Sequence, residues 1–177
     1  MAHVILGLLL LRPQSLYDLV KNFEAAVSLL YSASSGSIRR ALETLLTGGL
    51  IEVDEVGPGA RGRKTYRVTD AGREEFHSWM TGPMAGPDAE AAALPRLFFL
   101  GLLEPDERAE VLARVVARIE NDLARLEALG EQIDAAEIPE EFRDVFRFQR
   151  TTLDYGLASH RHALAWFREL AERTPAG

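Results

Sequence analysis

The stretch SSGSIRRALETLLTGGLIEV, from Ser34 to Val53, reads as one whole helix followed by the start of a strand. Small hydroxyl residues and a glycine open it, as is usual at a helix N-terminus. Its apolar residues recur at helical spacing, at Ile38, Ala41, Leu42, Leu45 and Leu46. The pair Gly48-Gly49 supplies a helix stop, and a β-branched run follows. The stretch therefore predicts an amphipathic helix that leads directly into a β-strand.

The polar face of this predicted helix carries arginine. At about 100° per residue the apolar side centres on Ile38 and Leu45. The opposite side holds Arg40, Glu43, Thr44 and Thr47, with Ser37 and Arg39 beside it. A solvated charged face is the simplest explanation of such a helix taken alone. However, arginine also binds guanine edges and phosphates, and the amides and hydroxyls of Ser34, Ser35, Gly36 and Ser37 can meet a phosphate oxygen.

The segment after the helix favours the second explanation. Two β-prone runs, Leu50 to Val56 and Lys64 to Thr69, are separated by the glycine-rich loop GPGARGR. We expect a hairpin whose loop residues Arg61, Arg63 and Lys64 reach a DNA backbone while the helix enters the major groove. A DNA duplex thus accounts for the helix and for the hairpin together.

The helices around this pair complete the pattern of the first domain. Val4 to Leu11 predicts a buried helix ended by Pro13. Ser15 is expected to cap a second helix, with Asp18 in a variant of the capping box, and Thr69 to cap a helix that runs through Trp79. Three helices followed by a hairpin is the order of a winged helix-turn-helix domain.

The rest of the chain predicts long helices behind a linker. The segment from Thr81 to Ala93 is rich in glycine, proline and alanine. We therefore expect a winged domain over residues 1–82, a linker over 83–93 and a helical domain over 94–177. The long helices of the last domain need an apolar partner surface, either each other or a second subunit. We expect their apolar stripe to form a dimer seam, at Leu112, Ile119, Leu126, Ile133, Leu157, Leu164 and Phe167. The predicted fold class is mainly α with a small β-hairpin wing and a C-terminal dimerisation domain of long helices.

Charge and composition bound the classes of function. The 177 residues carry a net charge of −7, which argues against nucleic acid when the chain is taken whole. Residues 1–82 are nevertheless neutral, and seven of their nine basic residues fall between Arg39 and Arg73. The sequence has no cysteine, which is typical of a cytoplasmic protein, and its longest apolar run, Val4 to Leu11, is too short to cross a membrane.

Four segments resemble the PadR family of bacterial transcriptional regulators. They are SLYDLVKNFE from Ser15, SSGSIRRALETLLTGGLIEV from Ser34, RGRKTYRVTDAGREEFHSW from Arg61 and LPRLFFLGLLEPDER from Leu94, in the family's order. The family usually has tyrosine where this chain has Arg39, and glycine where it has Leu16 before Tyr17. Arginine keeps the hydrogen-bond donor of that tyrosine and adds charge. The resemblance implies an N-terminal winged domain that binds DNA, in which Tyr17 joins the residues named above, and a C-terminal domain that forms a homodimer.

The sequence thus predicts a homodimeric repressor that binds an inverted-repeat operator in double-stranded DNA and is released by a small molecule or another signal. An apolar effector would lie among aromatic side chains, for which the candidates are Phe98, Phe99 and Trp166. A second hypothesis, suggested by the acidic helical domain, is a dimeric adaptor whose winged domain contacts proteins and not DNA. Steep salt dependence of duplex binding would distinguish the two.

Catalytic and metal sites are not expected. No nucleophile elbow, phosphate loop or dinucleotide fingerprint occurs, so the chain is not predicted to be an enzyme or to bind a cofactor. His160 and His162 lie two residues apart, which places them on different sides of a helix, where they cannot share a metal ion. His160 falls instead on the apolar stripe and is expected in the core or the interface.

Overall fold

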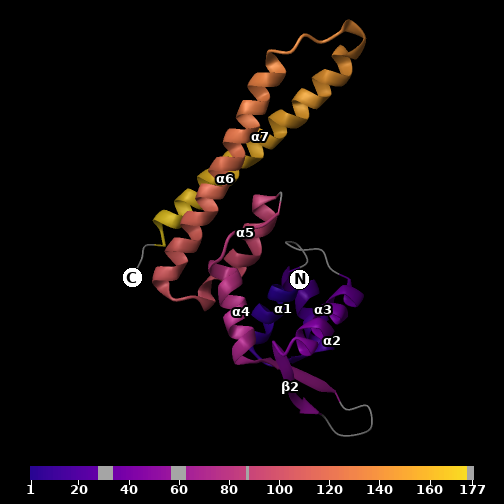
Figure 1. Ribbon diagram of the computed structural model, residues 1–177, viewed down its shortest axis with the longest axis vertical. Coiled ribbons are helices and arrows are strands. Elements are labelled where there is room, and N and C mark those ends of the chain that lie inside the picture. Colours follow the sequence, from indigo (N-terminus) through magenta and orange to yellow (C-terminus); the bar gives the residue numbers. More distant parts are fainter. Residues whose placement is uncertain (28–33, 57–62, 87, 175–177) are drawn as a thin grey trace. The chain divides into compact units, whose positions relative to one another are not determined.

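The computed structural model describes residues 1–27, 34–56, 63–86 and 88–174, and it divides into two compact units (Figure 1). The first, here called the winged unit, comprises Met1–Pro83 and Leu94–Leu103. The second, the hairpin unit, comprises Met84–Ala93 and Glu104–Gly177. Each unit has its own buried apolar side chains.

The winged unit contains the predicted helices and the predicted hairpin. Its elements are α1 (Ala2–Leu11), β1 (Gln14–Ser15), α2 (Leu16–Asn22), a π-helical turn η1 (Phe23–Val27), α3 (Ser35–Thr47), β2 (Ile51–Val56), β3 (Lys64–Val68), α4 (Asp70–Thr81) and a 3₁₀ turn η2 (Leu100–Leu102). The helix α5 (Ala89–Phe98) begins in the hairpin unit and ends in the winged unit. The order of helices and hairpin confirms the winged helix-turn-helix prediction.

Local capping explains where these helices begin and end. At α2 the capping box is complete, because Ser15 Oγ accepts from the Asp18 amide and Asp18 Oδ2 accepts from the Ser15 amide. At the end of α3, Gly49 adopts a left-handed conformation with φ of 69°. Its amide donates to Leu46 O at 3.1 Å and the Leu50 amide donates to Leu45 O at 3.0 Å, a Schellman stop. The glycine pair therefore ends the helix as predicted.

The sheet has one strand more than the sequence indicated. Strands β2 and β3 form the predicted antiparallel hairpin, with Ile51 opposite Val68 and a bulge between Val53 and Glu55. The short β1 adds to the free edge of β3, where it pairs Ser15 with Thr65. Two residues carry too little pattern to be recognised as a strand. Together the three strands form the wing and its support.

The core of the winged unit includes residues 94–103, which the sequence prediction assigned to the helical domain. Phe99, expected in the second domain, is buried in the first, where its ring lies edge-on to Phe76 of α4 at 5.8 Å. A methyl group on Gly7 of α1 would lie 2.6 Å from that ring, so only glycine leaves room for it. Residues 94–103 thus belong to the winged unit, and residues 89–93 of the expected linker are helical.

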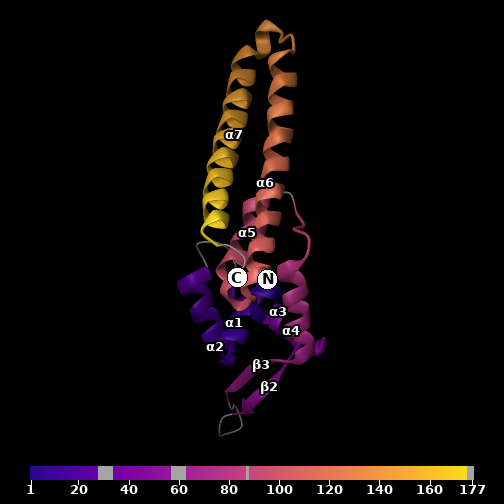
Figure 2. The ribbon, with the colours of Figure 1, turned by 90° about the vertical axis from the view of Figure 1, so that its left-hand side faces the viewer.

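The hairpin unit consists mainly of two long antiparallel helices, α6 (Pro105–Asp134) and α7 (Arg143–Glu172), joined through a 3₁₀ turn η3 (Glu140–Phe142). Figures 1 and 2 both show α6 and α7 side by side. Leucine side chains of each helix lie near a glycine of the other, at distances that would also admit a methyl group. A methyl group on Gly156 of α7 would lie 4.0 Å from Leu126 of α6, and one on Gly130 of α6 would lie 3.7 Å from Leu153 of α7.

The apolar stripe predicted as a dimer seam is largely buried within this single chain. Leu112, Ile119, Leu157, Leu164 and Phe167 are each less than 9% exposed, and Leu126 and Ile133 are half-buried. The sequence prediction placed the whole stripe at a subunit interface, whereas these side chains are already buried within the single chain. Each long helix needed an apolar partner surface, and its own chain supplies one.

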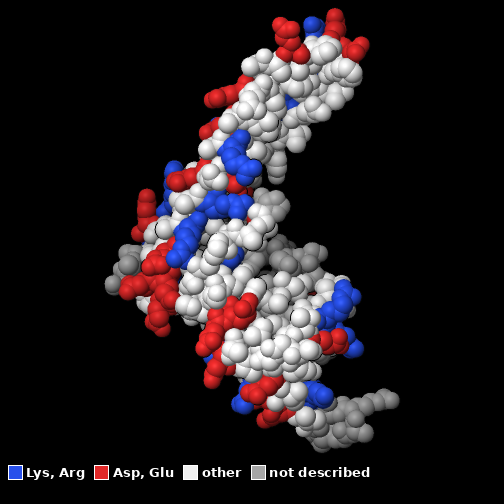
Figure 3. All heavy atoms as spheres, in the orientation of Figure 1, with Lys and Arg blue, Asp and Glu red and all other residues white. Residues whose placement is uncertain are grey.

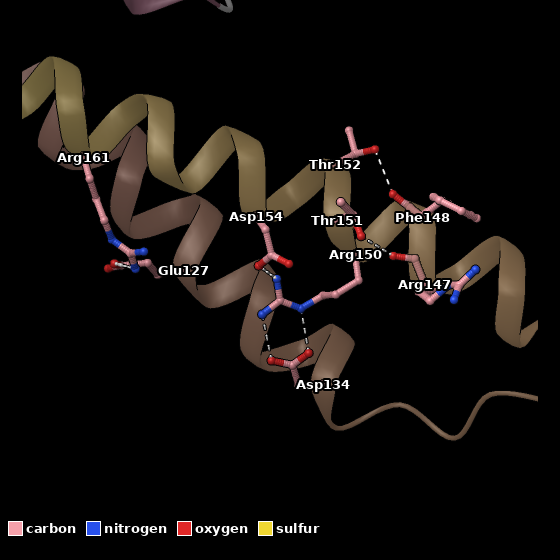
Figure 4. Close-up of polar contacts among 9 residues, drawn as sticks. All are labelled: Glu127, Asp134, Arg147, Phe148, Arg150, Thr151, Thr152, Asp154 and Arg161. Atoms are coloured by element: carbon pink, nitrogen blue, oxygen red, sulfur yellow. Dashed lines mark hydrogen bonds and ion pairs between the residues drawn. The ribbon is translucent and has the colours of Figure 1, made fainter.

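Ion pairs along the edges of this hairpin fix its register. Arg150 of α7 donates to both carboxylate oxygens of Asp134 of α6, at 2.7 and 3.1 Å, and also pairs with Asp154 (Figure 4). These hydrogen bonds hold the pKa of Asp134 below its usual range. Nearer the middle of the helices, Arg161 pairs with Glu127 at 2.8 Å (Figure 4). Because a bidentate pair fits only one alignment, such contacts favour one register over its neighbours.

Within the described ranges, no helix is long and apolar enough to cross a membrane.

Candidate nucleic-acid interface

The candidate surface is the N-terminal half of α3. Ile38, Leu42 and Leu45 bury its apolar side against the rest of the winged unit, which turns Arg39 and Arg40 to solvent. Ser34 caps the helix, since its Oγ accepts from the Ser37 amide at 3.2 Å. The polar face predicted from the sequence is therefore exposed and presented by a well-formed helix.

Both arginines of α3 lack an ionic partner among the residues that the structure describes. In the hairpin unit, by contrast, every arginine that is described takes part in an ion pair or another polar contact. Figure 3 shows Lys and Arg side chains at the edge of the winged unit where α2 and α3 lie. The positive charge that is not neutralised within the chain is thus concentrated on the winged unit, although the whole protein is acidic.

A shallow groove runs along the C-terminal part of the same face. It is lined by Arg40, Glu43, Thr44, Thr47 and Gly48. The Thr44 hydroxyl donates to the carbonyl of Arg40 at 2.9 Å and keeps its oxygen as an acceptor. Glu43 adds a carboxylate, which would accept from cytosine and would repel a phosphate. This face can therefore hydrogen-bond to base edges, whereas the N-terminus of the helix suits a phosphate.

The structure places Arg63 differently from the prediction. Its Nε donates to Ser15 Oγ at 3.0 Å and its Nη2 pairs with Asp18, so the guanidinium joins β3 to the start of α2. These bonds lower the pKa of Asp18 to about 2, the Ser15 hydroxyl contributing most and Arg63 next. Arg63 is thus held by contacts within the winged unit, whereas the sequence prediction had it reach a DNA backbone from the loop.

The other predicted contacts are distributed over the same unit. Tyr17 of α2 is 70% exposed, and Lys64 at the start of β3 is exposed without an ionic partner in the described part of the chain. Arg61 lies outside the described residues. Arg12 and Lys21 are exposed, have no ion pair among the described residues, and were not predicted. Sequence pattern gives no signal for them, because charge neutralisation depends on neighbours in space.

The three predicted effector residues do not form one described pocket. Phe99 is a core residue of the winged unit, and Phe98 lies edge-on to it at 4.9 Å. Trp166 belongs to the hairpin unit, where it is 42% exposed and lies edge-on to Phe167. His160 is half-buried, and its Nδ1 lies 2.9 Å from Gly156 O, as expected of a satisfied core histidine. Over the described ranges no group of side chains could hold a metal ion.

Two family models match the chain, one to each part. Residues 5–78 match the transcriptional regulator PadR-like family, and residues 92–174 match the virulence activator alpha C-terminal family. Residues 5–78 form a PadR-like transcriptional regulator domain. The matched family is one of transcriptional regulators and not of enzymes, and the match gives no support to the adaptor hypothesis.

Individual PadR-like proteins resemble the chain along its full length. The negative transcriptional regulator PadR of Bacillus subtilis is 22% identical over 170 residues, which cover 95% of this chain and 93% of that protein. PadR has been solved with operator DNA (21% identical, 97% and 96% of the chains, TM-score 0.43) and with p-coumaric acid (21%, 98% and 93%, 0.42). A PadR-like regulator of Bacillus cereus is 26% identical over 98% and 95% of the chains, with a TM-score of 0.43.

Proposed function

We propose that this chain represses transcription in the cytoplasm by binding operator DNA as a homodimer through the exposed face of α3. The observation that carries the proposal is the pair Arg39 and Arg40, which are exposed and have no ionic partner in the described part of the chain. In a chain of net charge −7, exposed guanidinium groups without a carboxylate partner remain available to another anion. The phosphates and guanine edges of a duplex supply it.

The geometry of α3 suggests how the contacts divide. Ser35 and Gly36 form the first turn beyond the Ser34 cap, and Gly36 has no side chain to obstruct a phosphate. Arg40 lies one turn further along, on the face with Thr44, where it would reach base edges. Arg39 lies beside that face and would reach the backbone, and Lys64 would add a phosphate contact from the wing. Phosphate contacts would position the helix, and Arg40 would read sequence.

A homodimer is part of the proposal because one winged unit offers few cationic groups. Two units related by a two-fold axis can contact half-sites about 34 Å apart in successive major grooves. The hairpin unit carries exposed apolar side chains suited to a contact between copies, namely Leu129, Phe142, Val145, Phe148 and Trp166. These replace the buried stripe as the proposed seam. We further propose that a small apolar or aromatic molecule releases the repressor.

Mobility-shift titration tests the central proposal. The duplexes are the DNA flanking the protein's own coding region, searched for an inverted repeat, and a scrambled duplex of equal length. A repressor with six or more phosphate contacts should lose affinity by orders of magnitude between about 50 and 200 mM salt. It should also prefer the inverted repeat. The absence of any retained duplex at about 50 mM salt would contradict the proposal.

A further inference from the structure

The exposed face of α3 carries a carboxylate beside its arginines. Glu43 lies three residues after Arg40, which places the two side chains next to each other on the helix, with Cβ atoms about 5–6 Å apart. Both side chains are exposed, and both line the shallow groove along α3. Because phosphates repel a carboxylate, Glu43 lowers the affinity of this face for any duplex in which it finds no hydrogen-bond donor.

Among the described residues of α3, Arg40 and Glu43 form no ion pair with each other. Helical side chains lean towards the N-terminus of their helix, so an i,i+3 pair forms more readily when the acid comes first. The pair Asp144–Arg147 of α7 has this order and closes to 3.6 Å. In α3 the arginine comes first and leans away from Glu43. Since Glu43 has no other ionic partner in the described part of the chain, its carboxylate is available as an acceptor.

The rotation of α3 directs this pair towards base edges. Ile38 and Leu45 are each 1% exposed and mark the side of the helix that faces the winged unit. The opposite side faces the base pairs when such a helix lies in the major groove. Arg40 and Glu43 lie on that opposite side, whereas Arg39 lies beside it and nearer to a phosphate backbone.

The base edges of the major groove distinguish a carboxylate from a guanidinium. Guanine presents two acceptors, N7 and O6, which suit the paired donors of arginine. Cytosine presents the amino group N4, which suits a carboxylate. Adenine also presents an amino group, but its N7 acceptor lies beside it, and thymine presents the acceptor O4. Glu43 is therefore matched to cytosine and opposed to the other three bases, whereas Arg40 is matched to guanine.

We propose that Glu43 is a specificity-determining residue that accepts a hydrogen bond from cytosine N4, while Arg40 donates to N7 and O6 of a guanine. Their Cβ separation of about 5–6 Å compares with a base-pair rise of about 3.4 Å, so the two contacts fall on neighbouring base pairs. Each operator half-site should thus contain two adjacent G·C pairs. Repulsion of Glu43 by other duplexes adds to the discrimination. This inference rests on the proposed binding of operator DNA through α3.

Selection from a pool of random duplexes, followed by sequencing of those that the full chain retains, tests the inference. The wild-type protein should select an inverted repeat with two adjacent G·C pairs in each half. Glu43→Ala should lose the preference for cytosine at one of these pairs and keep the other pair. Glu43→Gln should instead favour adenine at that position, since glutamine hydrogen-bonds to adenine N6 and N7.

Titration with the selected duplex measures the same contact as an affinity. Replacing the cytosine opposite Glu43 by thymine should weaken the wild-type protein about tenfold or more and should hardly affect Glu43→Ala. On a scrambled duplex, Glu43→Ala should bind more tightly than wild type, because the repulsion is removed. Glu74→Ala is the matched control. It removes an exposed carboxylate of α4 that has no ion pair among the described residues, and it should keep the wild-type motif and the loss on replacing cytosine.

The inference is overturned if the selected half-sites lack adjacent G·C pairs, or if Glu43→Ala keeps the wild-type preference for cytosine. A wild-type protein that selects no common motif would contradict the proposed operator binding itself, and the role of Glu43 with it. The two failures are therefore distinguishable in one experiment. Circular dichroism shows whether each variant is folded; should Glu43→Ala unfold, Glu43→Gln carries the test, and an unchanged preference for cytosine in that variant overturns the inference.

Discussion

Arg118 donates from Nε to Asp122 Oδ2 at 2.8 Å, one turn further along α6. The same guanidinium donates from Nη1 to Met84 O at 2.8 Å and from Nη2 to Gly86 O at 2.7 Å. These hydrogen bonds hold the segment from Met84 to Gly86 against α6. A second arginine, Arg96, holds the chain just before this point in the winged unit, where it donates to Trp79 O and Pro83 O.

The first prediction concerns the hydrogen bonds of Arg118. Arg118→Ala would leave Asp122, whose side chain is only 10% exposed, without its nearest guanidinium and would free both carbonyls. We expect the free energy of unfolding to fall by about 3 kcal/mol, because a mostly buried charge loses its partner. Urea titration measures the loss, and limited proteolysis should cut faster near Met84. Arg114→Ala, which breaks an exposed pair with Glu110, is the control and should cost less than about 1 kcal/mol.

The second prediction concerns the reading of sequence by α3. Arg40→Ala should cost about 1–3 kcal/mol of operator binding and relax the preference at one base pair. Arg39→Ala should weaken binding to all sequences alike and flatten the salt dependence, as loss of a phosphate contact does. Arg114→Ala, in the exposed Arg114–Glu110 pair of the hairpin unit, should change nothing. Unchanged operator affinity in both α3 variants would remove the helix from the major groove.

The third prediction concerns pH. The folded-state pKa of Asp18 is about 2, below the ordinary 3.8, first because the Ser15 hydroxyl donates to it and next because Arg63 does. A lowered pKa means that the charged form stabilises the fold. This stabilisation is fully present above about pH 4, declines as the pH falls from 3.8 towards 2, and is lost below that. The difference in the free energy of unfolding between wild type and Asp18→Asn should therefore shrink over this window.

Urea titrations at several pH values measure that difference. Arg63→Gln is the matched variant, because it removes the second cause and leaves both Ser15 hydrogen bonds to Asp18. It should keep part of the pH dependence that Asp18→Asn loses. A stability difference between wild type and Asp18→Asn that stays constant from about pH 5 to pH 2 would show that Asp18 is not the group responsible.

The fourth prediction concerns the packing of α4 on the wing. A methyl group on Gly72 would lie 2.0 Å from Leu50 O and 2.7 Å from Val68 Cγ1. We expect Gly72→Ala to cost about 3 kcal/mol or more, because backbone must move to relieve the clash. Gly36→Ala in the same unit meets only Ser34 Oγ at 3.9 Å and should be close to neutral. Thermal unfolding of the two variants gives the comparison, and equal melting temperatures would refute the assigned packing.

The fifth prediction concerns the proposed dimer seam. Phe148 is 64% exposed on α7, so Phe148→Lys should leave the fold of the chain intact and weaken the contact between copies. Sedimentation should show a monomer, and operator affinity should fall by about 100-fold or more as the second half-site is lost. Thr151→Lys, an exposed neighbour, is the control for added charge. A folded monomer that keeps wild-type operator affinity would contradict the dimer proposal.

Substitution of Leu164 or Phe167 would not test the dimer seam. Both are less than 9% exposed within the single chain. Leu164→Asp should therefore unfold the hairpin unit, since it would bury an unpaired charge, and it would give no information about dimerisation.

Local sequence was sufficient for the elements that cap and pattern themselves. The Ser15–Asp18 box, the Gly48-Gly49 stop, the Thr69 cap and the apolar period of α3 each involve residues a few positions apart. Their geometry depends on backbone hydrogen bonds that neighbours in sequence make. For the same reason the apolar period of α3 was enough to predict its exposed face, with Arg39 and Arg40.

Tertiary structure decided which surface each pattern meets. The heptad stripe of α6 and α7 specified an apolar partner but not whether that partner was a second chain or the same one. Phe99 belongs to the winged unit because Gly7 leaves room for its ring, a fit between residues far apart in sequence. Arg63 is neutralised and Arg40 is not because Asp18 lies beside only one of them. The sequence determined local conformation and amphipathic faces, while packing and ion pairing between distant residues determined which apolar and charged groups remain exposed, because those energies depend on distance in space.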